Sequence, residues 1–157
     1  MIPFLYILFI FLQQPGPCQV PEQIIRLVHM IKPTTELVTE EKINPVWKEY
    51  LKTECPTVVE GDFNGDGIED YGLIITDGPY RLIIAESNSD TYRLVGILNI
   101  DFGISNRGLG FGMELYPAGT GFAHDGILFE KFGSFTWVYH WNHGKYEKVI
   151  IGEPAEQ

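Results

Sequence analysis

The sequence predicts an α+β domain in which two N-terminal helices pack on a largely antiparallel β-meander of about seven to eight strands. Apolar residues recur at helical spacing early in the chain, and from residue 57 onward they follow the two-residue period of strands. The connections between these strands are short, which favours antiparallel pairing. The chain has 157 residues, of which 45% are hydrophobic, enough for a single core.

The first 18 residues are predicted to be a signal peptide whose cleavage point the sequence leaves open. Residues 2–12 form an apolar run that is shorter than the roughly 20 residues of a membrane-spanning helix. We therefore expect an exported protein, periplasmic or secreted, with one domain over residues 19–157 and no membrane insertion after processing. Pro17 stands where a lipoprotein signal has a small residue, so export fits better than a lipid anchor on Cys18.

The two cysteines allow two outcomes. Cys18 and Cys55 pair in an oxidising compartment if cleavage falls before Cys18; otherwise Cys55 is a lone thiol. The sequence leaves both open.

Two helices are expected between residues 19 and 53. Pro21 opens the first, Pro33 follows its end, and its apolar stripe comprises Ile24, Ile25, Leu27, Val28 and Ile31. Asn44 and Pro45 provide an N-cap and a first helical residue for the second. Its expected buried face consists of Val46, Trp47, Tyr50 and Leu51.

Strands are expected where alternating apolar stretches are separated by Gly, Pro, Asn, Asp and Ser. These stretches are residues 57–60, 71–76, 81–87, 92–99, 110–116, 126–131, 135–141 and 146–151. In the seventh, four aromatic residues alternate and so share one face, which is either core or, if open, a surface for sugars or peptides.

The charge balance narrows the range of partners. The chain has 21 acidic and 11 basic residues and a formal net charge of −10, with no Lys/Arg-rich block. Phosphate recognition needs clustered basic side chains, so we expect neither nucleic acid nor an anionic membrane surface as partner. A protein or carbohydrate partner remains, and the oligomeric state is open.

One segment has a pattern that points to metal chemistry. Oxygen-bearing side chains fall at alternating positions in residues 61–70, at Asp62, Asn64 and Asp66, and Asp70 follows. Calcium takes six to eight oxygen ligands, and alternate residues of a tight loop can direct that many inward. Gly67 falls where the loop must turn sharply, and the carbonyl of Ile68 is the expected backbone ligand, which leaves the Ile68 side chain free for the core.

The flanks distinguish between kinds of calcium loop. An EF-hand needs a glutamate at position twelve, where this chain has Leu73, and it needs flanking helices, whereas both flanks here are predicted strands. The stretch Gly61 to Ile75 resembles the calcium loop of FG-GAP and VCBS-type repeats, and the chain resembles small exported bacterial proteins with one such loop. The resemblance implies a Ca²⁺ site with these ligands: Asp62, Asn64, Asp66 and Asp70 by side chain and Ile68 by carbonyl. A propeller is not implied, because the motif occurs once.

An alternative is an acidic turn held by side-chain-to-backbone hydrogen bonds without metal. We favour calcium in a structural role, joining the helical part to the sheet. Between Glu54 and Asp77 there is no Lys or Arg, so the surrounding field attracts divalent cations in general, and selectivity over magnesium is open. Glu60 and Glu69 are expected to be solvated.

Other polar clusters give weaker signals. The glycine-rich stretch 103–121 is the best candidate for a mobile loop that contacts a partner. The residues expected to contact the partner are Arg107, Tyr116 and, just beyond the stretch, His124. Neighbouring side chains of an extended chain diverge, which argues against a shared site for His140 and His143, or for His124 and Asp125. Glu114 and Glu130 would suit a glycosidase only at a distance that the sequence does not set.

We therefore expect an exported, calcium-binding, non-enzymatic binding or interaction module with no catalytic residues. One alternative is an inhibitor or immunity-type protein that docks an acidic surface on a basic enzyme. The other is a hydrolase with a site that these motifs do not identify.

Overall fold

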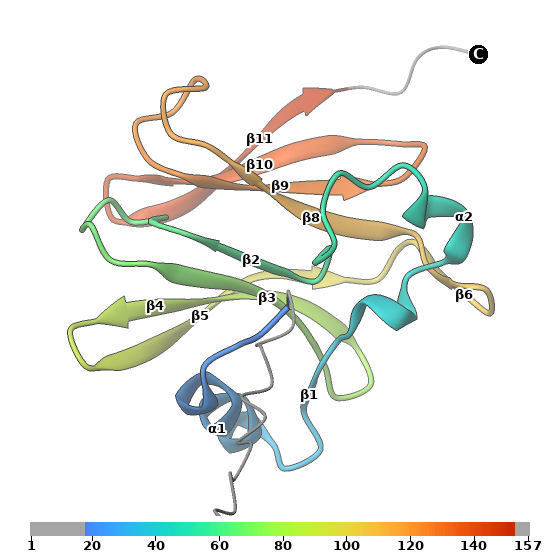
Figure 1. The fold of residues 1–157 in the computed structure, drawn as a ribbon, viewed down its shortest axis with the longest axis horizontal. Coiled ribbons are helices and arrows are strands. Elements are labelled where there is room, and N and C mark those ends of the chain that lie inside the picture. Colours follow the sequence, from blue (N-terminus) through green and yellow to red (C-terminus); the bar gives the residue numbers. More distant parts are fainter. Residues whose placement is uncertain (1–17, 153–157) are drawn as a thin grey trace, which may run out of the picture.

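The computed structural model describes residues 18–152, and it differs from the expected fold in its helices and its sheets. The molecule is mainly β, with one substantial helix and two principal sheets (Figure 1). The expected pair of N-terminal helices on one meander is therefore wrong. The signal-peptide prediction concerns residues almost all of which lie outside the described range.

The first helix is present and the second is not as expected. Helix α1 (Glu22–Ile31) buries Ile24 and Val28, two members of the predicted stripe. After it come only strand β1 (Glu36–Leu37), a 3₁₀ turn (Glu40–Lys42) and the four-residue helix α2 (Pro45–Lys48). Asn44 does cap α2, accepting the N–H of Val46 at 3.1 Å.

The predicted buried face of the second helix fails because α2 ends after one turn. Trp47 and Leu51 pack against the core, but Val46 and Tyr50 are 59% and 71% exposed. Residues 33–45 include three threonines and two prolines, which favour extended backbone over helix.

The first sheet is antiparallel, with strand order β1-β3-β4-β5, and β2 also pairs with β3. Its longer strands are β2 (Val58–Gly61), β3 (Asp70–Thr76), β4 (Tyr80–Asn88) and β5 (Thr91–Ile100). The β2 register ends with Gly61 opposite Asp70, so residues 62–69 form the loop of a β-hairpin.

The second sheet is also antiparallel, with strand order β11-β10-β9-β8. It contains β8 (Phe111–Tyr116), β9 (Gly126–Lys131), β10 (Thr136–Asn142) and β11 (Lys145–Gly152). A small ribbon of β6 (Ile104–Ser105) and β7 (Gly108–Leu109) connects the two sheets along the chain.

The layers follow from the two-residue period of the strands. On β3 and β4, Leu73, Ile75 and Ile83 face α1, whereas Ile74, Leu82 and Ile84 face the second sheet. The inter-sheet core is strongly aromatic and includes Phe111, Phe129, Trp137 and Tyr139. Figure 1 shows the resulting order: α1, the first sheet, then the second sheet.

Cys18 and Cys55 form a disulfide with Cα atoms 5.3 Å apart, which was one of the two outcomes left open. The bond joins the beginning of the described chain to the segment just before β2. A cysteine in a disulfide has no thiol for a lipid, so the disulfide and a lipid anchor on Cys18 exclude each other. Within residues 18–152, no helix has the length and apolarity needed to cross a membrane.

Candidate metal centre

The predicted calcium loop is the connection between β2 and β3, and its ends are fixed by the pairing of Gly61 with Asp70. Gly65 and Gly67 have φ values of 78° and 83°, a conformation that glycine adopts at little cost. Phe63 is 1% exposed and anchors the loop in the inter-sheet core. The loop is therefore anchored to the core through Phe63.

Asp62 organises the turn by accepting three backbone N–H groups. Its Oδ1 accepts from Gly65 at 2.8 Å and from Asp66 at 3.1 Å, and its Oδ2 accepts from Gly67 at 2.9 Å. Asn64 Oδ1 accepts from the N–H of Asp66 at 3.0 Å, and Asp66 Oδ1 accepts from Ile68 at 2.8 Å. These bonds hold the oxygens of positions 62, 64 and 66 inside the turn.

Asp70 is the buried member of the set. It is fully buried, and its carboxylate accepts the N–H of Phe63 at 3.2 Å and the N–H of Ser87, on β4, at 2.7 Å. The pKa of Asp70 is raised to about 6, chiefly by burial and less by the charge of Asp66, while the backbone hydrogen bonds oppose the rise. Asp70 thus connects the loop to the middle of the first sheet.

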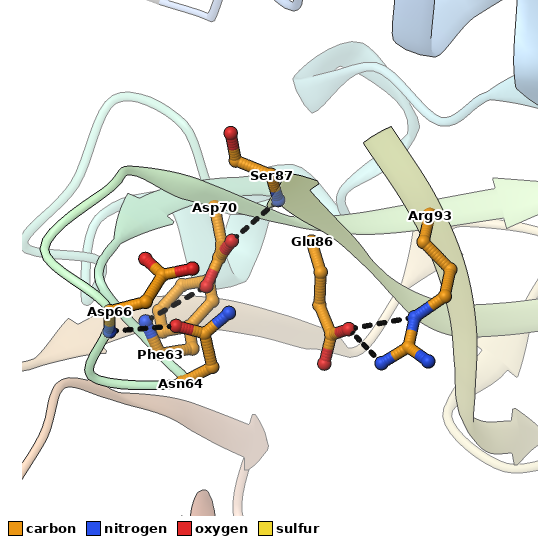
Figure 2. Close-up of polar contacts among 7 residues, drawn as sticks. All are labelled: Phe63, Asn64, Asp66, Asp70, Glu86, Ser87 and Arg93. Carbon is orange, nitrogen blue, oxygen red and sulfur yellow. Dashed lines mark hydrogen bonds and ion pairs between the residues drawn. The ribbon is translucent and has the colours of Figure 1, made fainter. Parts of the chain in front are cut away.

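Each predicted ligand side chain keeps acceptor capacity beyond these hydrogen bonds. An ionised carboxylate offers about four lone-pair positions and an amide oxygen two. The hydrogen bonds above use three positions on Asp62, one on Asn64, one on Asp66 and two on Asp70, so each side chain keeps at least one. Figure 2 shows the Asn64, Asp66 and Asp70 side chains close together at the loop. Calcium favours such uncharged and charged oxygens in combination.

Carboxylates alone do not make the site. Within residues 18–152, no three His, Cys, Asp or Glu side chains are grouped so that they could hold a metal ion by themselves. The predicted set needs the amide oxygen of Asn64 and the carbonyl of Ile68 as well as the three aspartates. The Ile68 side chain is 40% exposed, so the expectation that it packs in the core is wrong.

Glu60 and Glu69 are both exposed, as expected for solvated side chains. Hydrogen bonding with Glu60 and repulsion from its charge raise the pKa of Glu69. The hydroxyl of Tyr71 donates to Glu60 Oε1 at 3.2 Å. The pair lies beside the loop and adds to the negative field there.

The segment between β8 and β9 contacts the loop, and sequence reasoning missed this contact. Asp125 Oδ2 accepts the N–H of Asp62 at 3.1 Å, while its Oδ1 accepts the N–H of Ala118 at 2.8 Å. The ring of His124 lies over Gly65, where an added Cβ would come within 2.2 Å of it. These residues are about 60 positions away along the chain, so no local pattern could have indicated the contact.

The three predicted partner-loop residues do not form one surface. Arg107 lies in the turn between β6 and β7, at the opposite end of the molecule from the β8–β9 connection (Figure 1). Tyr116 ends β8, and its hydroxyl donates to the carbonyl of Thr120 at 2.7 Å. His124 is half-buried against the calcium loop.

Two other polar pairs are His140 with His143 and Glu114 with Glu130. His140 stacks on Phe122, with ring centroids 4.0 Å apart, and His143 is exposed in the β10–β11 turn. Glu114 and Glu130 lie on the neighbouring strands β8 and β9, and burial, then repulsion from Glu114, raises the pKa of Glu130. Glu114 Oε1 accepts the backbone N–H of Lys52 at 3.0 Å, which gives that carboxylate a structural contact.

Comparison of the chain with protein-family models, with curated proteins and with solved structures finds no match. The resemblance of residues 61–75 to FG-GAP and VCBS-type loops therefore stays a prediction.

Proposed function

We propose that this protein is an exported, non-enzymatic binding or interaction module in which Ca²⁺ closes the loop between β2 and β3. Asp62, Asn64, Asp66 and Asp70 would hold the ion by side chain and Ile68 by its carbonyl. The observation that carries the proposal is that all four side chains are fixed by backbone N–H groups and still keep free acceptor positions.

The electrostatics of the loop support the same proposal. Asp70 is fully buried beside the charge of Asp66, and its pKa is raised as a result. A divalent cation would lower the pKa of Asp70 again, because it stabilises the ionised form of every carboxylate around it. The role proposed for the ion is structural, since Asp70 also holds the backbone of β4 through Ser87.

Calorimetric titration of the disulfide-bonded mature chain with CaCl₂ tests this proposal. The wild type is expected to bind one Ca²⁺, and Asp66→Ala is expected to lose the binding, because position 66 supplies a ligand without supporting a buried strand. Asp101→Asn removes an equal charge at an exposed position outside the loop and is expected to bind as the wild type does.

The proposal is overturned if the wild type takes up no Ca²⁺, or if Asp66→Ala and Asp101→Asn bind equally well. The same titration with MgCl₂ determines which cation the loop prefers. Because Mg²⁺ demands near-octahedral geometry and retains water, we expect it to bind more weakly than Ca²⁺.

A further inference from the structure

A second site is indicated by an open cleft between β5 and the β10–β11 hairpin. The cleft has a volume of about 560 Å³, within the range of pockets that hold small ligands. We call it the hairpin cleft and define it by six of its lining residues: Glu86, Arg93, Gly96, Trp141, Lys145 and Tyr146.

One wall of the hairpin cleft is aromatic. Trp141 and Tyr146 are cross-strand partners, with ring centroids 4.9 Å apart and planes at 64°. Farther back on the same strand, Trp137 and Tyr139 are 7% and 5% exposed, whereas Trp141 is only half-buried. The alternating aromatic face is therefore core at one end and open at the other.

The cleft also contains two buried polar atoms without partners. Glu86 is 5% exposed and bonds the exposed Arg93 through Oε2. Burial, then the charge of Glu86 and hydrogen bonding to it, raises the pKa of Tyr146, so the hydroxyl faces Glu86. Neither Glu86 Oε1 nor that hydroxyl has a hydrogen bond of good geometry among the described residues. A buried polar atom left unpaired costs free energy, so a ligand that pairs with both atoms gains affinity.

The charges around the cleft are neutralised within the protein. Arg93 pairs with Glu86, as Figure 2 shows, and Lys145 Nζ lies 2.7 Å from Glu147 Oε1. An ionic ligand would have to compete with these pairs. A neutral ligand with several hydroxyl groups would not, since each hydroxyl both donates and accepts.

We propose that the hairpin cleft binds a neutral saccharide of one to three units. A pyranose ring has an apolar C–H face that stacks on Trp141, and its hydroxyl groups can donate to Glu86 Oε1 and accept from Tyr146. The Arg93 side chain is 70% exposed, so its guanidinium can shift to admit a sugar hydroxyl to the second Glu86 oxygen. This proposal does not depend on the calcium loop.

Val95 offers a variant that fills the cleft from β5. Val95 lines the cleft, is half-buried and is the cross-strand partner of Ile84, which faces the second sheet. Val95→Trp therefore places a larger side chain in the cleft. Phe135→Ala is the matched control for Trp141→Ala, because Phe135 is an aromatic residue that is 42% exposed and does not line the cleft.

The test is calorimetric titration of the mature chain in EGTA with maltotriose, cellotriose, xylotriose and chitotriose. At least one should bind with a dissociation constant below about 10 mM, a weak affinity that suits a small open site. Val95→Trp and Trp141→Ala should each weaken that binding about tenfold or more, while Phe135→Ala leaves it unchanged. Glu86→Gln should weaken it about tenfold, the cost of losing a hydrogen bond to a charged group.

The proposal is overturned if none of the four trisaccharides binds, or if Val95→Trp and Trp141→Ala bind as tightly as the wild type. Thermal unfolding of each variant identifies any that fails to fold. Because the blocking and aromatic substitutions lie on different strands, the loss of one to misfolding still leaves the other as a test. Success or failure here is separate from the calcium titration, since EGTA removes that ion.

Discussion

The first sheet contains two buried carboxylates on neighbouring strands, and they differ in what balances their charge. Glu86, on β4, is 5% exposed and pairs with Arg93 on β5. Asp70, at the start of β3, is fully buried and accepts only backbone N–H groups. The protein thus provides a cationic side chain for one acid and only backbone donors for the other. A buried charge needs a counter-charge or hydrogen bonds, and in the function proposed above the counter-charge of Asp70 is an ion from solution.

The largest expected effect is that of removing the Asp70 carboxylate. Asp70→Ala leaves the N–H groups of Phe63 and Ser87 without their acceptor, and each unpaired buried donor costs about 1–3 kcal/mol. We expect the metal-free protein to lose about 2–4 kcal/mol in its free energy of unfolding, measured by urea denaturation in EGTA. Asp101→Ala, at an exposed site, should change it by less than about 0.5 kcal/mol. Equal effects of the two substitutions would contradict this account of Asp70.

The second effect is a pH dependence of stability in the metal-free protein. The pKa of Asp70 rises from an ordinary 3.8 to about 6 on folding, so the folded state holds its proton more tightly than the unfolded state. The stabilisation from this proton is complete below about pH 4 and is lost as the pH rises through 6, amounting to about 2–3 kcal/mol. The difference in unfolding free energy between wild type and Asp70→Asn, measured from pH 4 to 7 in EGTA, isolates this contribution.

Saturating calcium should abolish that loss, because the cation stabilises the ionised carboxylate. A wild-type protein whose pH dependence matches that of Asp70→Asn in EGTA would show that Asp70 does not titrate in this range.

The third effect sharpens the comparison by testing how the loop is held in place. Asp125 accepts the N–H of Asp62 and so acts as a positioning residue. Loss of such support around a metal typically weakens binding by 10–100-fold. We expect Asp125→Ala to lower the calcium affinity about tenfold in calorimetric titration. Tyr116→Phe removes the hydroxyl contact with Thr120 in the same segment without touching Asp62, and should bind calcium normally. An unchanged affinity in Asp125→Ala would rule out this positioning role.

The smallest effect concerns Glu86, whose charge is balanced by the Arg93 side chain. Arg93→Ala removes the partner of Glu86, but the Arg93 side chain is 70% exposed, so water and salt screen much of the loss. We expect about 1 kcal/mol of destabilisation by urea denaturation and no change in calcium affinity. A large drop in calcium affinity would mean that the two acids share one electrostatic site.

Local sequence patterns predicted the strands well and the assembly poorly. The expected strand 126–131 coincides with β9, and the expected strands 71–76 and 81–87 lie within β3 and β4. A strand pattern does not tell which layer meets each face of a sheet, so the sequence suggested one meander where the protein has two packed sheets. The length of the second helix was overestimated, because Asn44 and Pro45 indicate where a helix begins and not where it ends.

The candidate site shows the same limit. The spacing of residues 62–70 predicted a tight loop, and the loop has that form, with glycines at the left-handed positions. The contacts of Asp70 with Ser87 and of Asp62 with Asp125 depend on how strands pair and pack. The exposure of Ile68 likewise follows from the position of the loop at the edge of the molecule.

The most direct measurement is thermal unfolding of the mature chain at pH 7 with excess calcium and with EGTA, for wild type and Asp66→Ala. A ligand at about 100 times its dissociation constant adds about 2.7 kcal/mol, which raises the midpoint by several degrees in a domain of this size. We predict that calcium raises the wild-type midpoint and leaves that of Asp66→Ala unchanged. Superimposed curves for the wild type in calcium and in EGTA would contradict the assignment of a cation to Asp70.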